Sequence, residues 1–314
     1  MNYIFDLLLN ILTSGLPCCL LALGIFLTYR LLDFADLTAE GSFLMGGAVC
    51  LTLIVKGVDP FTSTIIAFIV GAICGIITGL LNTCLNIPKL LSGIITMTAT
   101  ASIALLIMGF TSSKSPFTNL VTLSNKDNTI YSIFYGGVIP NQVVESIVML
   151  IVVILFNSLV YFFFGTEYGM AIRATGMNEQ MARSQGVNSK LATIVCVSLS
   201  NALIGLAGAL FAQDSRSMDV KTASGFLVIG LASILIGESI FGKRSFKNWI
   251  ISVSLGAVVY FVIINVAIAL GFPTQLKNLL YALLITIALC IPLIKSLFSL
   301  IKKKIVTKGE NENA

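Results

Sequence analysis

The sequence predicts an all-α membrane protein, a polytopic bundle of eight to ten transmembrane helices. Of its 314 residues, 57% are apolar and 11% are charged, whereas about a quarter of the residues in a soluble protein are charged. So few charged side chains cannot cover a globule in water, but a lipid bilayer tolerates an apolar outer surface. In addition, apolar windows of about 20 residues, long enough to cross a hydrocarbon core of about 30 Å, recur between short polar segments.

Nine such windows give the expected spans, and together they form one transmembrane domain over residues 1–301. The spans lie near residues 13–31, 41–56, 61–86, 90–111, 143–164, 191–212, 224–241, 249–270 and 279–300. The Ser-Gly-Leu-Pro motif at 14–17 could break the first helix and allow one additional membrane segment. That segment would move the N-terminus to the other side of the membrane. Two longer polar loops, 112–142 and 165–190, interrupt the series.

The polar, basic tail at 302–314 follows the last span, and its end at 308–314 contains no apolar anchor. We therefore expect deletion of residues 308–314 to leave folding and assembly unchanged. Size-exclusion chromatography of the purified transport complex measures this, and loss of assembly would contradict the expectation.

The residue types that are missing exclude most catalytic chemistry. The chain has no histidine, and its seven cysteines lie in apolar stretches without a CxxC pair. Nucleophile–histidine pairs and HExxH metal sites are therefore excluded. Residues 237–244, GESIFGKR, resemble a phosphate-binding loop, but Arg244 stands where a hydroxyl should bind Mg²⁺. We expect no catalytic residue, no metal and no bound cofactor in this chain, and no nucleic-acid partner.

An internal repeat joins two distant parts of the chain. LTAEGSFLMGGA begins at residue 37 and KTASGFLVIGLA begins at residue 221, with five identities in twelve positions and no gap. The order of the spans makes the two copies enter the membrane from opposite sides. This is the arrangement of an inverted repeat, which is frequent in transporters.

The basic residues predict the orientation of the chain. If the loop at 165–190 is cytoplasmic, 13 of the 19 lysines and arginines lie on the cytoplasmic side, as the positive-inside rule requires. We therefore expect the N-terminus outside, the C-terminus inside and the loop at 112–142 outside.

The loop at 165–190 contains the signature of a short helix. Asn178 is suited to cap it, Glu179 favours its first turn, and Gly186 is suited to end it. Glu179 and Arg183 have the i, i+4 spacing of an ion pair. Two turns of helix are unstable alone in water, so the segment needs a surface to hold it. That surface is either a partner protein or the lipid headgroups.

The segment GMAIRATGMNEQMARSQGVN, residues 169–188, resembles the cytoplasmic coupling segment of permeases in the branched-chain amino acid and ribose class of ABC importers. The small-residue run at 201–212 and the hydrophobic layout extend the resemblance over nearly the whole chain. Residues 31–43, LLDFADLTAEGSF, resemble a subgroup linked to aromatic amino acid (tryptophan or tyrosine) uptake, although Ala39-Glu40 departs from the pattern. The resemblance assigns ATPase coupling to Gly169, Arg173, Ala174, Gly176, Asn178, Glu179, Met181, Ala182, Arg183 and Gly186.

The resemblance also implies the partners. A cytoplasmic ABC ATPase subunit uses ATP and contacts the coupling segment, and an extracytoplasmic solute-binding protein delivers a small polar solute. A second permease subunit, expected to be an identical copy, completes the pathway. The resemblance implies a multi-pass protein of the cell membrane that imports an amino acid, either aromatic or branched-chain.

Polar residues inside and outside the spans are the candidates for contacting solute and partner. The predicted pathway residues are Ser92, Thr96, Thr100, Asn82, Asn201 and Asn265, and the predicted docking residues for the binding protein are Asp214, Arg216, Asp219 and Lys221. Alternatively, the hydroxyl groups donate hydrogen bonds to carbonyls of their own helix, and the asparagine amides form hydrogen bonds between helices. The docking residues have the alternative of a solvated loop. The glycines of GxxxGxxxG at 71–79 predict close helix packing.

Two other functions are alternatives to the permease. An ion-coupled secondary transporter needs ionisable residues deep in the membrane, whereas the acidic residues of this chain, such as Asp36 and Glu40, are expected at span ends, extending towards the interface. An intramembrane enzyme needs paired carboxylates or a nucleophile–base pair at one depth, and the sequence shows neither.

Overall fold

The computed structural model describes residues 2–111, 117–124, 128–134, 141–273, 276, 279–280, 282–284 and 286. Eight helices within these ranges are long and apolar enough to cross a membrane. They confirm the predicted polytopic helical bundle and match eight of the nine expected spans. Most of the ninth, at 279–300, and the tail at 302–314 lie outside the described residues.

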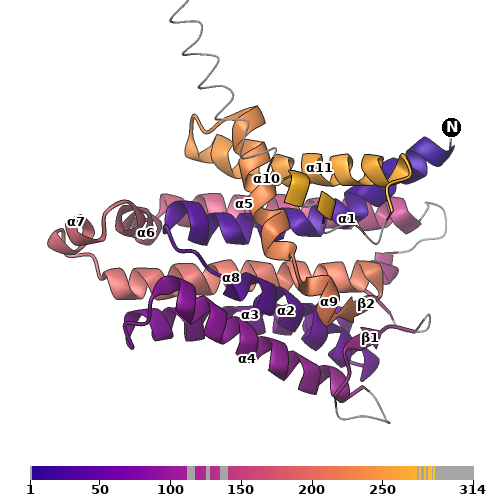
Figure 1. Cartoon of the computed structure of the whole chain (residues 1–314), viewed down its shortest axis with the longest axis horizontal. Coiled ribbons are helices and arrows are strands. Elements are labelled where there is room, and N and C mark those ends of the chain that lie inside the picture. The colour runs from indigo at the N-terminus through magenta and orange to yellow at the C-terminus, as the bar shows by residue number, and fades with distance from the viewer. Residues whose placement is uncertain are drawn as a thin grey trace, which may run out of the picture.

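Most of the long helices lie roughly along one axis, and α10 crosses the others steeply (Figure 1). The long helices are α1 (Asn2–Phe26), α2 (Thr38–Val55), α3 (Pro60–Thr83), α4 (Lys89–Gly109), α5 (Asn141–Gly165), α8 (Ser189–Ser215), α10 (Phe226–Phe241) and α11 (Phe246–Ala269). The short elements are a π-helical turn (Leu27–Leu31), a 3-10 turn (Ser132–Phe134), α6 (Glu167–Met177), α7 (Glu179–Ser184), α9 (Val220–Ala223), β1 (Leu120–Thr122) and β2 (Ser217–Asp219). In Figure 1, α6 and α7 lie at one end of the bundle, and β1 and β2 lie at the other.

The N-terminal helix is continuous through Pro17. The further segment that the motif at 14–17 left open is therefore not formed. Helix α1 passes directly into the π-helical turn, and the candidate span runs from Ile11 to Leu31.

Helices α1, α2 and α8 form the centre of the bundle, because most of their residues are buried, whereas α4 and α5 are mainly exposed. Glycine permits the closest contacts. A Cβ added to Gly46 of α2 would lie 2.1 Å from the carbonyl oxygen of Gly205 in α8. The predicted glycine face of α3 packs on the same helix, since a Cβ on Gly75 would lie 2.4 Å from the Val197 carbonyl oxygen. The expectation of close packing at 71–79 is confirmed.

The two copies of the repeat occupy α2 and the pair α9–α10. They run in opposite directions: α2 runs towards β2, since a Cβ added to Gly47 would lie 3.0 Å from the Met218 sulfur, whereas Glu238, near the end of α10, pairs with Arg30 at the other end of the bundle. The copies also meet: the Gly225 backbone N–H donates to a Glu40 carboxylate oxygen at 2.9 Å. Gly225 has a φ of +98°, so the second copy is broken where the first forms a continuous helix.

Two polar segments that are far apart in the sequence pair at the end opposite to α6 and α7. Strand β1 pairs antiparallel with β2, with Leu120 opposite Asp219. The Arg216 guanidinium also donates to the Ser124 carbonyl oxygen at 3.3 Å. The described part of the loop at 112–142 therefore lies beside the predicted docking residues.

Candidate functional site

The predicted coupling segment folds into two short helices, α6 and α7. Asn178 caps α7 by accepting a hydrogen bond from the Met181 backbone N–H at 3.0 Å. Gly186, with a φ of +84°, follows the end of that helix. Thr166 caps α6 through the Gly169 N–H. The local signals of cap, first-turn acid and terminal glycine therefore predict this structure correctly.

Three side chains attach α7 to the start of α8. Arg183 pairs with Glu179 at 2.5 Å and donates from Nε to the Ser189 hydroxyl at 2.6 Å. Ser189 in turn donates to the same Glu179 oxygen at 3.1 Å. An exposed ion pair adds little stability by itself, but this triangle fixes the orientation of α7 relative to α8.

Helix α6 packs on α8 and also contacts three other long helices or their ends. At Gly176, an added Cβ would lie 1.8 Å from the Leu31 carbonyl oxygen, at the end of the first span. At Gly169, it would lie 2.4 Å from the Phe163 carbonyl oxygen in α5. The Arg173 guanidinium lies 4.5 Å from the centroid of the Phe246 ring, at the start of α11. A displacement of α6 therefore acts on α1, α5 and α11 together.

Four large apolar side chains lie exposed on the outer surface of the coupling segment, among polar ones. Met177 is 89% exposed and Met181 is 63% exposed, and Tyr168 and Met170 are also exposed. Methionine side chains adapt their shape and are frequent on binding surfaces. Ala182, by contrast, is buried against the bundle. The predicted coupling residues therefore divide between an outer face and an attachment face.

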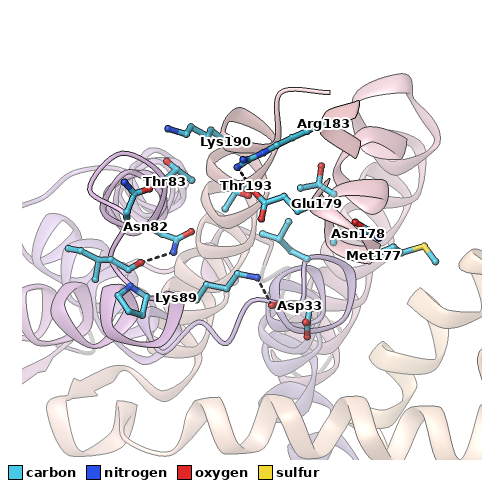
Figure 2. A pocket seen from close by; sticks show the side chains of 16 residues that line it. Asp33, Asn82, Thr83, Lys89, Met177, Asn178, Glu179, Arg183, Lys190 and Thr193 are labelled. Carbon is cyan, nitrogen blue, oxygen red and sulfur yellow. Dashed lines mark hydrogen bonds and ion pairs between the residues drawn. The ribbon is translucent and has the colours of Figure 1, made fainter. Parts of the chain in front are cut away.

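A polar cavity of about 500 Å³ lies beside this segment. Figure 2 shows Asn82 and Lys89 on one side of it and Asp33, Glu179 and Arg183 on the other. The Lys89 ammonium donates to the Asp33 carbonyl oxygen at 3.0 Å, and the Asn82 amide donates to the Ile87 carbonyl oxygen at 2.8 Å. The cavity lies between the coupling segment and the turn between α3 and α4.

The six predicted pathway residues do not line one cavity. Ser92, Thr96 and Thr100 are buried on α4, and each hydroxyl donates to a carbonyl of its own helix. Asn82 lies at the polar cavity beside the coupling segment, whereas Asn265 lies at a second cavity near the other end of the bundle. A role in contacting solute stays a prediction for these residues.

Asn201 belongs to a buried polar network that the sequence did not predict. Its amide donates to an Asp36 carboxylate oxygen at 2.7 Å and accepts from the Ser42 hydroxyl at 2.7 Å. Asn201 lies twelve residues after Ser189, or about 18 Å along α8. The expectation that Asp36 lies at a span end and extends to the interface is therefore wrong, because the link before α2 folds back into the bundle.

The predicted docking residues lie together at the end opposite to the coupling segment. Asp214 and Arg216 end α8, and Asp219 caps α9 by accepting from the Lys221 backbone N–H at 3.3 Å. No group of three or more His, Cys, Asp or Glu side chains that could hold a metal occurs among the described residues.

Comparison with known proteins decides the class. Residues 7–289 match the family described as the permease component of branched-chain amino acid transport systems. The chain belongs to this family. It is the permease component of an ABC transport system, as the resemblance of residues 169–188 implied, and it is not an enzyme, since the ATPase activity of such systems lies in separate subunits.

Individual relatives of this permease differ in their cargo. It is 33% identical over 278 residues to the tyrosine transport system permease protein of Clostridioides difficile, covering 88% of each chain. It is 29% identical to the probable branched-chain amino acid transport permease protein LivH of Methanocaldococcus jannaschii, covering 77% of each. It is 26% identical to the galactofuranose transporter permease protein YtfT of Escherichia coli, covering 94% of this chain and 81% of that protein. No solved structure matches the chain.

Proposed function

We propose that this permease is the membrane-spanning subunit of an ATP-driven importer of a small polar solute, an amino acid that is aromatic or branched-chain. A cytoplasmic ATPase subunit binds the coupling segment, and an extracytoplasmic binding protein docks near Asp214, Arg216, Asp219 and Lys221. Two copies of the permease form the pathway between them. The N-terminus is outside and the C-terminus is cytoplasmic.

The observation that carries this proposal is the attachment of α6 to three long helices. The exposed methionines offer an ATPase an apolar surface for binding. The close contacts at Gly169 and Gly176 would transmit a movement of the ATPase to the backbone of the spans. A rigid connection between a partner and a bistable bundle is what alternating access requires. The resemblance of residues 31–43 and the tyrosine transport relative support an aromatic amino acid as solute.

Transport in proteoliposomes containing permease, ATPase and binding protein tests the energy source. We expect uptake of radiolabelled amino acid to require ATP on the side of the membrane where the ATPase subunit is bound. Uptake that persists without ATP and collapses with an ion gradient would favour a secondary transporter instead.

Labelling of an introduced cysteine tests the orientation. In a background with Cys84→Ser and Cys290→Ser, Met177→Cys places a thiol on the exposed coupling surface. We expect an impermeant maleimide to label it only after the cells are permeabilised, because the segment faces the cytoplasm. Lys56→Cys, at the opposite end of the bundle, is the matched control and should react in intact cells. Labelling of Met177→Cys in intact cells would overturn the proposal.

A further inference from the structure

A second cavity, of about 330 Å³, lies near the end of the bundle opposite to the coupling segment, where α1, α8, α9, α10 and α11 meet. Three phenylalanines from three helices line it: Phe211, Phe226 and Phe261. The rings of Phe211 and Phe226 are in edge contact, with centroids 5.0 Å apart and an interplanar angle of 71°. Aromatic rings pack favourably against another ring in offset or edge geometry, so this wall suits a planar apolar group.

Polar groups from other elements line the same cavity. Lys221 of α9 is exposed and makes no ion pair with any described residue. The Asn265 amide nitrogen donates to the Phe261 carbonyl oxygen at 2.9 Å, and within the described residues its side-chain oxygen has no hydrogen bond. An unpaired ammonium is complementary to a carboxylate, and a free amide oxygen accepts a hydrogen bond from an ammonium. The cavity therefore combines the chemistry needed for both ends of a zwitterion with an aromatic wall.

The cavity borders the junction of the two repeat copies. Ser224 and Phe226 line it, and Gly225 between them donates to Glu40 of the first copy. Phe226 also stacks on Phe43 of that copy, with centroids 4.1 Å apart. In secondary transporters built from inverted repeats, solute sites lie at the interface of the repeats, beside interrupted helices. A ligand here would lie beside the contact between the two copies of the repeat.

We infer that this cavity is a solute site that selects a free amino acid with an aromatic side chain. The ring lies against the three phenylalanines, the carboxylate pairs with Lys221, and the ammonium donates to the Asn265 side-chain oxygen. The volume is at the lower end of the range of small-molecule sites, which fits a single amino acid. This inference rests on the proposed importer function and names the cargo class.

Photolabelling tests the location. L-4-azidophenylalanine is supplied to proteoliposomes containing the full complex, with its ATPase and binding protein, and is irradiated during ATP-driven uptake. We expect covalent adducts on peptides that contain residues 222–226 or 261–268, and we expect excess L-tyrosine, but not L-leucine, to suppress them. Adducts confined to other segments, or adducts that L-tyrosine does not suppress, would overturn the inference.

Substitutions test the polar contacts in the same vesicles. At saturating binding protein, Lys221→Ala and Asn265→Ala should each lower L-tyrosine uptake about tenfold, the size expected for losing a hydrogen bond to a charged group. Lys221→Arg should restore most of the uptake, and Asn248→Ala, at the far end of α11, should have no effect. Unchanged uptake in both alanine variants would overturn the inference.

The two levels of the hypothesis fail differently. ATP-dependent uptake of L-leucine without uptake of L-tyrosine would overturn the aromatic site but leave the importer function standing. Uptake of either amino acid that does not depend on ATP would overturn the importer function itself.

Discussion

Replacing Gly176 by leucine should reduce solute uptake at least about tenfold, while ATP hydrolysis by the assembled complex continues. The physical reason is the contact between α6 and the end of the first span. Even a single Cβ at Gly176 would lie 1.8 Å from the Leu31 carbonyl oxygen and 2.8 Å from the Leu32 Cα, and backbone atoms cannot move aside as a flexible side chain can. Helix α6 must therefore shift away from α1, at a cost of about 1–3 kcal/mol.

Parallel measurements of ATPase rate and of radiolabelled uptake in the same proteoliposomes check this result. Gly165→Leu is the matched control, because an added Cβ at Gly165 has nothing within 4 Å, although it lies just before the same segment. Gly176→Ala should give a smaller loss of uptake. It keeps the prediction testable if the leucine variant does not fold. Normal coupling in both Gly176 variants would show that this contact does not transmit movement.

Replacing Asp36 by alanine should lower the free energy of unfolding by about 3 kcal/mol, because two buried donors lose their acceptor at about 1–3 kcal/mol each. These donors are the Asn201 amide at 2.7 Å and the Thr38 backbone N–H at 2.8 Å. Asp36→Asn should cost less, because its side-chain oxygen still accepts from one of them. The double variant with Asn201→Ala should be less destabilised than the sum of the single changes, since the two residues share one network.

Thermal unfolding followed with a thiol-reactive fluorophore measures this stability. Five cysteines are buried in the bundle and react only when it opens: Cys18, Cys19, Cys50, Cys74 and Cys196. Cys84→Ser removes the exposed thiol among the described cysteines, and Cys290→Ser removes the cysteine that lies outside the described residues. Asp33→Asn is the control, because Asp33 is exposed and asparagine tolerates its φ of +50°. Equal unfolding temperatures for Asp36→Ala and Asp33→Asn would contradict a stabilising role for the network.

Several features of the protein could be predicted from the sequence because their signals are local. The length of the apolar runs gave eight of the nine spans in the described part of the chain, and the cap at Asn178 and the turn at Gly186 gave the ends of α7. The glycine face at 71–79 predicted a close helix contact. The repeat could be recognised from five identities at matching positions, but the sequence did not indicate the hydrogen bond between Glu40 and Gly225.

Other features depend on residues that are distant in the sequence. Nothing in the pattern around Asp36 indicates Asn201, 165 residues later, and the short link before α2 gives no sign that it folds back into the bundle. The sequence also gives no sign of the second cavity. This cavity brings Lys221, predicted as a docking residue, together with Asn265, predicted as a pathway residue.

The sequence by itself thus determined the spans and the short helices of the predicted coupling segment, because apolar length, helix caps and glycine spacing act within one or two turns of the chain. The class of the protein followed from the resemblance of residues 169–188 to a permease family. Only the tertiary structure decided which helix the coupling segment rests on, which polar groups satisfy one another and which side chains share a cavity. These depend on how helices approach and rotate about their axes, and that packing is set by all their contacts together.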